Sequence, residues 1–197
     1  MRTFTDDELT FRTANYVLRP MTASDARGEF RRWLGMPDIM HPLNLPARDV
    51  PVAECERYIG AFDRAARFLF CVETPGGEFR GFWIVTRGAS NATANVQMTS
   101  GVPTPEAKAV LLESTLTVGD WLFDTGAEKV VAHVVSTNRR TLEFVRATGY
   151  PEEGLLRGEM PNRATRRGRI DIHRFGMLAE DWRKTRPRME AMLRGQE

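Results

Sequence analysis

The clearest chemical signal in this sequence is TPEAKAVLLES, residues 104–114, at the start of its longest helical pattern. The small residues Ala107 and Ala109 would let backbone N–H groups come close to an anion, and the positive end of the helix dipole would reinforce such a site. The segment therefore predicts a phosphate-binding helix start. Taken alone, an ordinary helix start explains it more simply, with Thr104 as the N-cap and Pro105 as the first helical residue.

Two further side chains are suited to a site at a strand end. His133 lies in the apolar run VVAHVV, and Asn138 follows the end of that run. A neutral imidazole can accept a proton, whereas a lone histidine in an apolar strand is more often a hydrogen-bonded structural residue. The amide of Asn138 can hold a ligand, and it can equally cap the helix that begins at Arg139.

A mixed sheet must position these residues. Runs rich in aromatic and β-branched residues predict strands at 16–19, 67–74, 80–87, 94–99, 129–135, 154–160 and 168–178. Apolar residues at helical spacing predict helices at 22–34, 51–65, 108–123, 139–147 and 182–193. Residues 36–46 carry three prolines and are expected to form a loop. A long helix separates 94–99 from 129–135, and a crossover of this kind joins parallel strands.

The composition narrows the function classes. With 197 residues and 42% hydrophobic content, we expect one globular domain over 1–197, with 1–14 as an N-terminal extension. We find no membrane-spanning run and no signal peptide, and expect a cytoplasmic protein. Lys and Arg number 28 and Asp and Glu 26, a balance that argues against nucleic-acid binding. Cys55 and Cys71 belong to no CxxC or histidine cluster, so we expect reduced, buried thiols and no metal site.

Four segments occur in an order that is typical of one family. They are WLGMPDIMHPLN (33–44), TPEAKA (104–109), NRRTLEFVRATGYPEEG (138–154) and GRIDIHRFGMLAEDW (168–182). Together they resemble the GNAT superfamily of N-acetyltransferases, particularly its ribosomal-protein N-acetyltransferase-like branch, over about residues 15–182. In TPEAKA, the residues at the marked positions of the family loop Q/R-x-x-G-x-G/A are Thr104, Ala107 and Ala109. Each motif is weak alone, and their order and spacing carry the resemblance.

The resemblance implies a fold and an activity. The fold would be α/β (α+β), with a mixed sheet of six or seven strands, helices on both faces, and the fourth and fifth strands, 94–99 and 129–135, parallel and splayed. The activity would be acetyl-CoA-dependent transfer of an acetyl group to a primary amine of a small molecule, peptide or protein. Acetyl-CoA would be the co-substrate, with no metal, and the resemblance leaves a homodimer open.

The resemblance also implies site residues. A backbone N–H near Met98 or Thr99 would polarise the thioester carbonyl. The general base is unidentified, and the candidates are His133 and Asp171, although Asp171 can equally be a structural residue of its hairpin. The residues expected to bind CoA are Met98, Thr99, Val102, Ala107, Lys108, Ala109, Val110, Asn138 and Thr141.

The sequence departs from the family pattern at positions that matter for chemistry. Ala107 replaces a glycine, and its Cβ would restrict positive φ and narrow the approach of the pyrophosphate. Val145 replaces a tyrosine that is thought to protonate the departing thiolate. These departures favour an alternative function, a catalytically weakened GNAT-like module that binds acyl-CoA. An arginine run at 157–174 suggests a third, interaction with acidic partners, although a solvated loop explains the run more simply.

Overall fold

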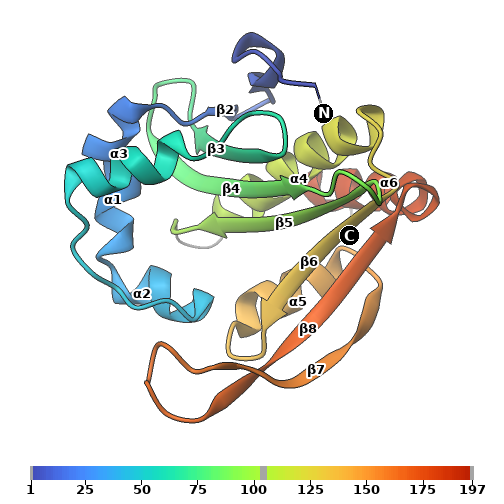
Figure 1. Ribbon diagram of the computed structural model, residues 1–197. Helices are drawn as coiled ribbons and strands as arrows, with labels where there is room; N and C mark the ends of the chain where they lie inside the picture. The colour runs from blue at the N-terminus through green and yellow to red at the C-terminus, as the bar shows by residue number, and fades with distance from the viewer. Residues whose placement is uncertain (1, 103–105, 196–197) are drawn as a thin grey trace.

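In the described residues of the computed structural model, 2–102 and 106–195, eight strands form one mixed sheet in the order β1-β2-β3-β4-β5-β6-β8-β7 (Figure 1). The strands are β1 Phe11–Arg12, β2 Val17–Pro20, β3 Arg67–Glu73, β4 Phe79–Arg87, β5 Thr93–Ser100, β6 Lys129–Val135, β7 Glu152–Pro161 and β8 Arg169–Leu178. All neighbouring strands are antiparallel except β5 and β6, which are parallel.

The prediction of six or seven strands was wrong, because it missed the short edge strand β1. Phe11 and Arg12 pair with Leu18 and Val17, and two residues are too few to show the alternation that reveals a strand in sequence. The extra strand also changes the numbering, so the parallel pair is β5 and β6 rather than the fourth and fifth strands. The segments predicted to be parallel, 94–99 and 129–135, are nevertheless the ones that pair in parallel.

Helices cover both faces of the sheet (Figure 1). They are α1 Glu29–Leu34, α2 Pro37–Met40, α3 Val52–Gly60, α4 Glu106–Asp124, α5 Arg139–Ala147 and α6 Ala179–Leu193, with short 3₁₀ helices η1 Asp7–Leu9, η2 Ala23–Arg27 and η3 His41–Leu43. Successive side chains of a strand point to opposite faces. Trp83 of β4 therefore packs in the core under α4 and α6, and its neighbour Phe82 packs in the core under α1 and α3.

The segment 36–46, predicted to be a loop, contains two short helices instead. Pro37 occupies the first turn of α2, where its missing N–H costs no hydrogen bond, and Pro42 lies in η3. Ile39 and Met40 are buried in the core under α1 and α3, which fixes this segment against the sheet. The predicted helix 22–34 is likewise divided, into η2 and α1, at Gly28.

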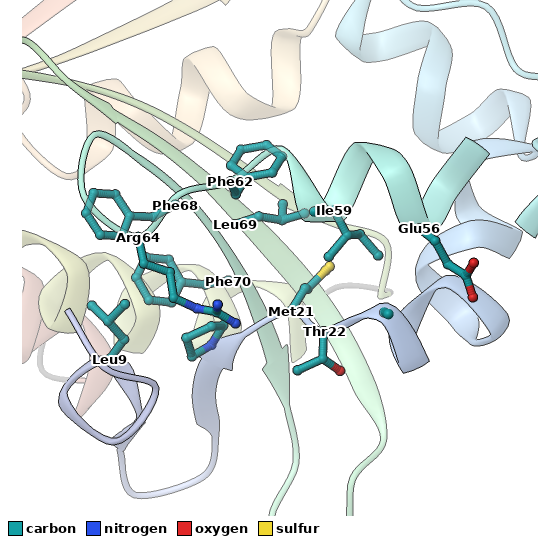
Figure 2. Close-up of a pocket in the computed structure, with 13 residues that line it drawn as sticks. Leu9, Met21, Thr22, Glu56, Ile59, Phe62, Arg64, Phe68, Leu69 and Phe70 are labelled. Carbon is teal, nitrogen blue, oxygen red and sulfur yellow. The ribbon is translucent and has the colours of Figure 1, made fainter. Parts of the chain in front are cut away.

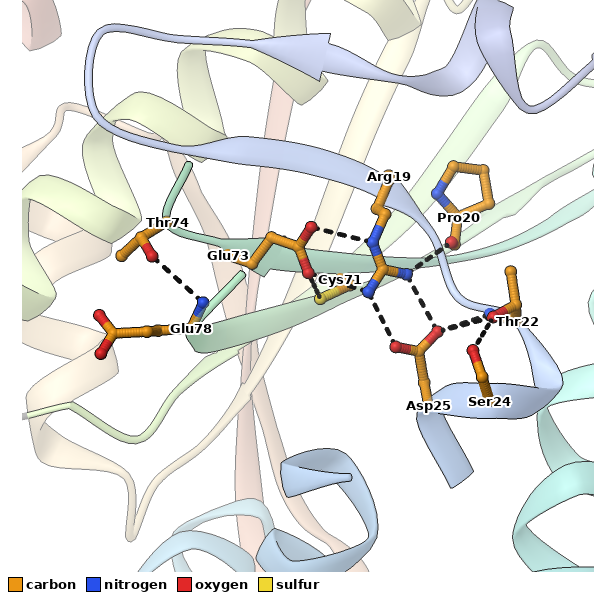
Figure 3. Close-up of polar contacts among 9 residues, drawn as sticks. All are labelled: Arg19, Pro20, Thr22, Ser24, Asp25, Cys71, Glu73, Thr74 and Glu78. Atoms are coloured by element: carbon orange, nitrogen blue, oxygen red, sulfur yellow. Dashed lines mark hydrogen bonds and ion pairs between the residues drawn. The ribbon is translucent and has the colours of Figure 1, made fainter. Parts of the chain in front are cut away.

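A partly buried arginine ties η2 to the sheet (Figure 3). Arg19 of β2 donates to Asp25 of η2 (Nη2 to Oδ1, 2.8 Å) and to Glu73 of β3 (Nε to Oε1, 3.0 Å). All three side chains are less than one-third exposed. The guanidinium thereby fixes η2 against strands β2 and β3. The helices α1 and α2 follow η2 in the chain.

The described part of the predicted N-terminal extension packs against the rest of the chain. Leu9 is fully buried, and the side chain of Thr13 donates to the carboxylate of Glu113 on α4. The backbone N–H of Asn15 donates to the same carboxylate at 3.1 Å. Glu113 is therefore a buried acceptor that joins the N-terminal segment to α4.

Candidate active site

The parallel strands β5 and β6 separate part of the way along. Their register runs through four residue pairs, from Thr93 with Lys129 to Val96 with Ala132. Beyond that point β5 stays paired with β4 as far as Ser100, and β6 stays paired with β8 as far as Val135. The two strands are therefore held by different neighbours and diverge, which opens a gap in the middle of the sheet.

A cleft of about 480 Å³ occupies this gap. Its walls come from the diverging ends of β5 and β6, from α2 and η3 on one side, and from α4 and α5 on the other. The main lining residues are Asp38, Leu43, Trp83, Gln97, Met98, Thr99, Val102, Leu111, Thr115, His133, Asn138, Arg140, Thr141, Phe144, Val145 and Tyr150. Its volume lies within the range of small-molecule sites in proteins.

The backbone of β5 presents N–H groups to this gap. Hydrogen-bonding direction alternates along an antiparallel strand, and the N–H of Gly88 donates to the carbonyl oxygen of Thr93 at 2.8 Å. Since the β4 and β5 register continues without a bulge, odd-numbered residues of β5 face β4 and even-numbered residues face β6. The N–H of Met98 therefore points into the gap, whereas the N–H of Thr99 points toward β4.

Two buried polar side chains near the Met98 N–H have no hydrogen-bond partner. The Thr99 hydroxyl and the Trp83 indole N–H have no hydrogen-bond partner, and both residues line the cleft. A buried polar group without a partner costs free energy that a ligand can recover. The two residues lie on adjacent strands and opposite faces of the sheet, so each face carries one unsatisfied group near the gap.

The helix start predicted to bind phosphate lies next to the cleft. Val102 lines the cleft, and α4 begins at Glu106, while Thr104 lies outside the described residues. The first backbone N–H groups of a helix have no partner within it, so they are available to an anion. Of the other predicted phosphate-binding residues, Lys108 is exposed, Ala109 is partly buried and Val110 is fully buried.

Ala107 has no strained backbone, contrary to the prediction. Ala107 belongs to α4 and is 1% exposed, so its backbone is helical and its Cβ lies in the protein interior. A helical residue needs no positive φ, and glycine would bring no conformational advantage at this position.

Replacing Ala107 with glycine is therefore expected to lower the free energy of unfolding by about 0.5–1 kcal/mol, the usual cost of glycine inside a helix. CoA affinity should change less than twofold. Chemical denaturation and calorimetric titration of the two proteins would check both values. A clear gain in affinity would show that the methyl group does restrict the anion site.

Asn138 acts as a helix cap, and it also lines the cleft. Its side-chain Oδ1 accepts a hydrogen bond from the backbone N–H of Thr141 at 3.2 Å, at the start of α5. Its other amide atoms and the Thr141 side chain remain beside the cleft. Arg140 donates to the carbonyl oxygen of Val102 at 3.4 Å, which connects the start of α5 to the segment before α4.

His133 directly follows the last residue of β6 that pairs with β5, is exposed, and lines the cleft. Partial desolvation lowers its pKa below the usual value, and the charge of Arg174, its partner on β8, lowers it further, against weaker opposing effects of Glu153 and Glu159. The imidazole is therefore neutral at pH 7. Since Val96 and Ala132 are register partners, the next residues, Gln97 and His133, lie on the same face of the sheet.

Asp171, the other candidate base, lies outside the cleft lining. Its Oδ1 accepts a hydrogen bond from the backbone N–H of Gly158 at 2.7 Å, and its backbone oxygen accepts from Ser136 at 2.9 Å. The carboxylate thus connects β8 to β7 across the hairpin. This arrangement corresponds to the structural alternative that the sequence left open.

One cleft residue with suitable chemistry escaped the sequence analysis. Val145, at the position of the expected tyrosine, is buried and lines the cleft, and Tyr150 lines the same cleft just beyond the end of α5. Burial raises the pKa of Tyr150 far above its usual value, so its hydroxyl stays protonated. Only the turn after α5, with Gly149 at a φ of 85°, brings this residue back toward the cleft.

The arginine run does not form a single surface. Arg174 pairs with Glu153 (Nε to Oε2, 3.1 Å), and Arg169 donates to the carbonyl oxygen of Glu159 at 2.9 Å. Arg163 and Arg166 line a shallow depression at the turn between β7 and β8. Several of these charges are thus used within the hairpin.

A second cavity, of about 250 Å³, lies between η1, β3 and α3 (Figure 2). Its lining is mostly apolar, including Ile59 and Phe70. Its two charged residues have partners, since Arg64 pairs with Asp6 and Glu56 with Arg27, each at 2.6 Å. It is remote from the diverging strands because no residue of β5 or β6 lines it.

In the described part of the chain, no group of three or more histidine, cysteine, aspartate or glutamate side chains is arranged to hold a metal ion. Cys55 and Cys71 are free and buried. None of the described helices combines the length and apolar character that a membrane span requires.

No family model and no curated protein matches this sequence. Solved structures, however, match it over most of its length. A GCN5-related N-acetyltransferase from Brucella melitensis has a TM-score of 0.74 and 18% identity, covering 93% of this chain and 85% of that one. A GNAT-family acetyltransferase from Bacillus anthracis has a TM-score of 0.71 and 13% identity, covering 87% and 99%.

A third structure, a spermidine N-acetyltransferase from Vibrio cholerae in complex with CoA and spermine, has a TM-score of 0.69 and 20% identity. The match covers 86% of this chain and 99% of that one. Identities this low establish the fold. With its diverging parallel strands and the helix that connects them, the chain has the fold of the GNAT acetyltransferases.

Proposed function

We propose that this protein is an acetyl-CoA-dependent N-acetyltransferase that acts on a primary amine of a small molecule, peptide or protein. The observation that carries the proposal is the cleft between β5 and β6, which joins a free backbone N–H, a neutral histidine and a protonated tyrosine within one cavity. The resemblance to the ribosomal-protein N-acetyltransferase-like branch, found in the sequence, remains part of this proposal.

The residues present fit acetyl-CoA. Leu111, Phe144 and Val145 give the α4 and α5 side of the cleft an apolar wall suited to the pantetheine arm, and Asn138 offers amide donors and acceptors. The first turn of α4 supplies unpaired N–H groups for the pyrophosphate. The unsatisfied Trp83 indole offers one further hydrogen bond.

Acetyl-CoA supplies the acetyl group as a thioester. The Met98 N–H would donate a hydrogen bond to the carbonyl oxygen, on which negative charge develops as the amine nitrogen attacks. A free alkyl amine is mostly protonated at pH 7 and must be neutral to attack, so His133 would take a proton from it before the C–N bond forms. Tyr150 would donate a proton to sulfur as the C–S bond breaks. A thiol with a pKa near 8.5 is already a fair leaving group. Proton removal by His133 would therefore contribute more to the rate than proton donation by Tyr150.

The alternative is a domain that binds acyl-CoA without transferring the acyl group. Val145 favours it, because a valine cannot protonate the thiolate at the position where the resembled family carries a tyrosine. The two functions differ in one measurable property, since only the enzyme releases free CoA in proportion to an added amine.

Calorimetric titration with acetyl-CoA, followed by detection of thiol release with a panel of primary amines, tests the proposal. We expect one acetyl-CoA to bind per chain and release of CoA to depend on the amine. Binding without transfer to any amine would favour the alternative. Absence of binding would reject both functions.

A further inference from the structure

An apolar cavity of about 240 Å³ adjoins the reacting centre on the α1 and α3 face of the sheet. Its walls come from the two helices, the segment after η3, and the strands β4 and β5. The apolar lining residues are Phe30, Leu34, Met40, Leu43, Leu45, Pro46, Val50, Phe82 and Ile84. It belongs to the same layer as the core under α1 and α3.

The cavity offers no unpaired negative charge to a cationic ligand among its described residues. Among the described residues that line it, the charged ones are Arg48 and Glu54, and these pair with each other (Nη1 to Oε2, 3.1 Å). Burial raises the pKa of the Cys55 thiol and of the Tyr58 hydroxyl, so both are uncharged at pH 7. The site is therefore suited to an uncharged, apolar group.

This cavity shares part of its wall with the cleft. Leu43 and Gln97 line both spaces. Gln97 lies on the same face of the sheet as His133, just where β5 and β6 separate. A molecule that places its amine beside His133 can therefore extend past Gln97 into the apolar cavity without crossing the sheet.

We propose that the acceptor is a primary amine that carries an aromatic or branched aliphatic group, and that this group occupies the apolar cavity while the amine faces His133. The inference rests on the proposed acetyl transfer and adds its acceptor class. An apolar cavity of roughly 150 Å³ holds a benzene molecule in another protein, so this one has room for a phenyl or isobutyl group. A second ammonium group would find no unpaired carboxylate among the described residues of this cavity.

The test compares amines that differ only in the group expected in the cavity. 2-Phenylethylamine and isoamylamine are compared with ethylamine and 1,4-diaminobutane at saturating acetyl-CoA. We expect kcat/KM to be at least about tenfold higher for the two apolar amines, since a single methylene in a fitted pocket already gives about tenfold or more. A peptide with an N-terminal phenylalanine tests whether the acceptor can be a protein. If its kcat/KM is comparable to that of 2-phenylethylamine, a protein with an apolar N-terminal residue can meet the same requirement.

A substitution inside the cavity locates the effect. Ile84 is fixed on β4 and cannot turn away, so Ile84→Phe should fill the space and lower kcat/KM for 2-phenylethylamine at least tenfold, with ethylamine changed less than about threefold. The matched variant Ile84→Val should leave both amines within about threefold. The Kd of acetyl-CoA should be the same in all three proteins.

The two proposals fail in different ways. Transfer that favours ethylamine or 1,4-diaminobutane would overturn the acceptor class and leave acetyl transfer intact. If no amine is acetylated, titration of 2-phenylethylamine into the CoA-loaded protein still decides the inference, because binding that Ile84→Phe weakens supports it. Absence of such binding overturns it.

Discussion

Replacing His133 with glutamine is expected to lower kcat for acetyl transfer by a factor of about 10² to 10⁴, the usual contribution of a general base. Glutamine keeps hydrogen-bonding capacity at the edge of the cleft and removes the group that accepts the proton. Since the acceptor side of the cleft holds His133 and CoA is expected on the α4 side, the Kd of acetyl-CoA should stay within about twofold. Steady-state thiol release and calorimetry measure the two quantities.

The pH dependence gives an independent check on the same residue. Because partial desolvation and Arg174 lower the pKa of His133, the imidazole is neutral above its usual titration range and becomes protonated only at lower pH. The rate should fall as pH drops through that lowered pKa, and this fall should be absent in His133→Gln. The matched control is His41→Gln, an exposed histidine of η3 outside the cleft lining, with unchanged kinetics. Equal losses in both variants would contradict the assignment.

Replacing Arg19 with methionine is expected to lower the free energy of unfolding by about 2–4 kcal/mol. The substitution leaves the carboxylates of Asp25 and Glu73, both mostly buried, without the guanidinium that separates and neutralises them (Figure 3). Arg19→Lys should lose less, because it keeps the charge but not the planar set of donors. Urea denaturation at pH 7 gives these values. Arg32→Met, at an exposed pair with Glu29, should change stability by no more than about 0.5 kcal/mol.

The stability difference at Arg19 should depend on pH. Burial alone would raise the pKa of Asp25, but the hydrogen bonds from Arg19 and Thr22 outweigh it, and the pKa is lowered. A carboxyl group with a lowered folded-state pKa contributes stability above its ordinary pKa and loses it as pH falls through the folded value. The difference between wild type and Arg19→Met should therefore be full at pH 7 and shrink below about pH 4. A difference that stays constant to pH 2 would mean that packing of the alkyl chain, and not charge, is responsible.

Most of the elements could be predicted from sequence because each has a local cause. The glycines at 126 and 149 follow α4 and α5 and adopt φ values of 93° and 85°, which few other residues tolerate. Their positions in the sequence therefore predict where both helices end. The parallel pair followed from the length of its connection. By contrast, α2 and η3 are held by burial of Ile39 and Met40 against distant residues, and no local pattern reveals such contacts.

The candidate site was less accessible to sequence reasoning. The spacing of Ala107 predicts a place in the anion site, yet the helix begins before this residue and turns its methyl group into the core. Tyr150 reaches the cleft only through the turn after α5. The apolar cavity combines β4, β5, α1 and α3, which are separated in the chain, so its existence depends on tertiary packing that spacing cannot encode.

The short register between β5 and β6 has a mechanical consequence. Seven residue pairs join β4 to β5 and seven join β6 to β8, but only four cross from β5 to β6 in the described sheet. The sheet thus consists of two halves, β1 to β5 and β6 to β8, which meet at this short register, here called the seam. The segment that contains α4 connects the two halves along the chain. A molecule bound along the open part of that seam would supply the cross-links that the strands lack, so that occupancy of the cleft and rigidity of the whole sheet are coupled.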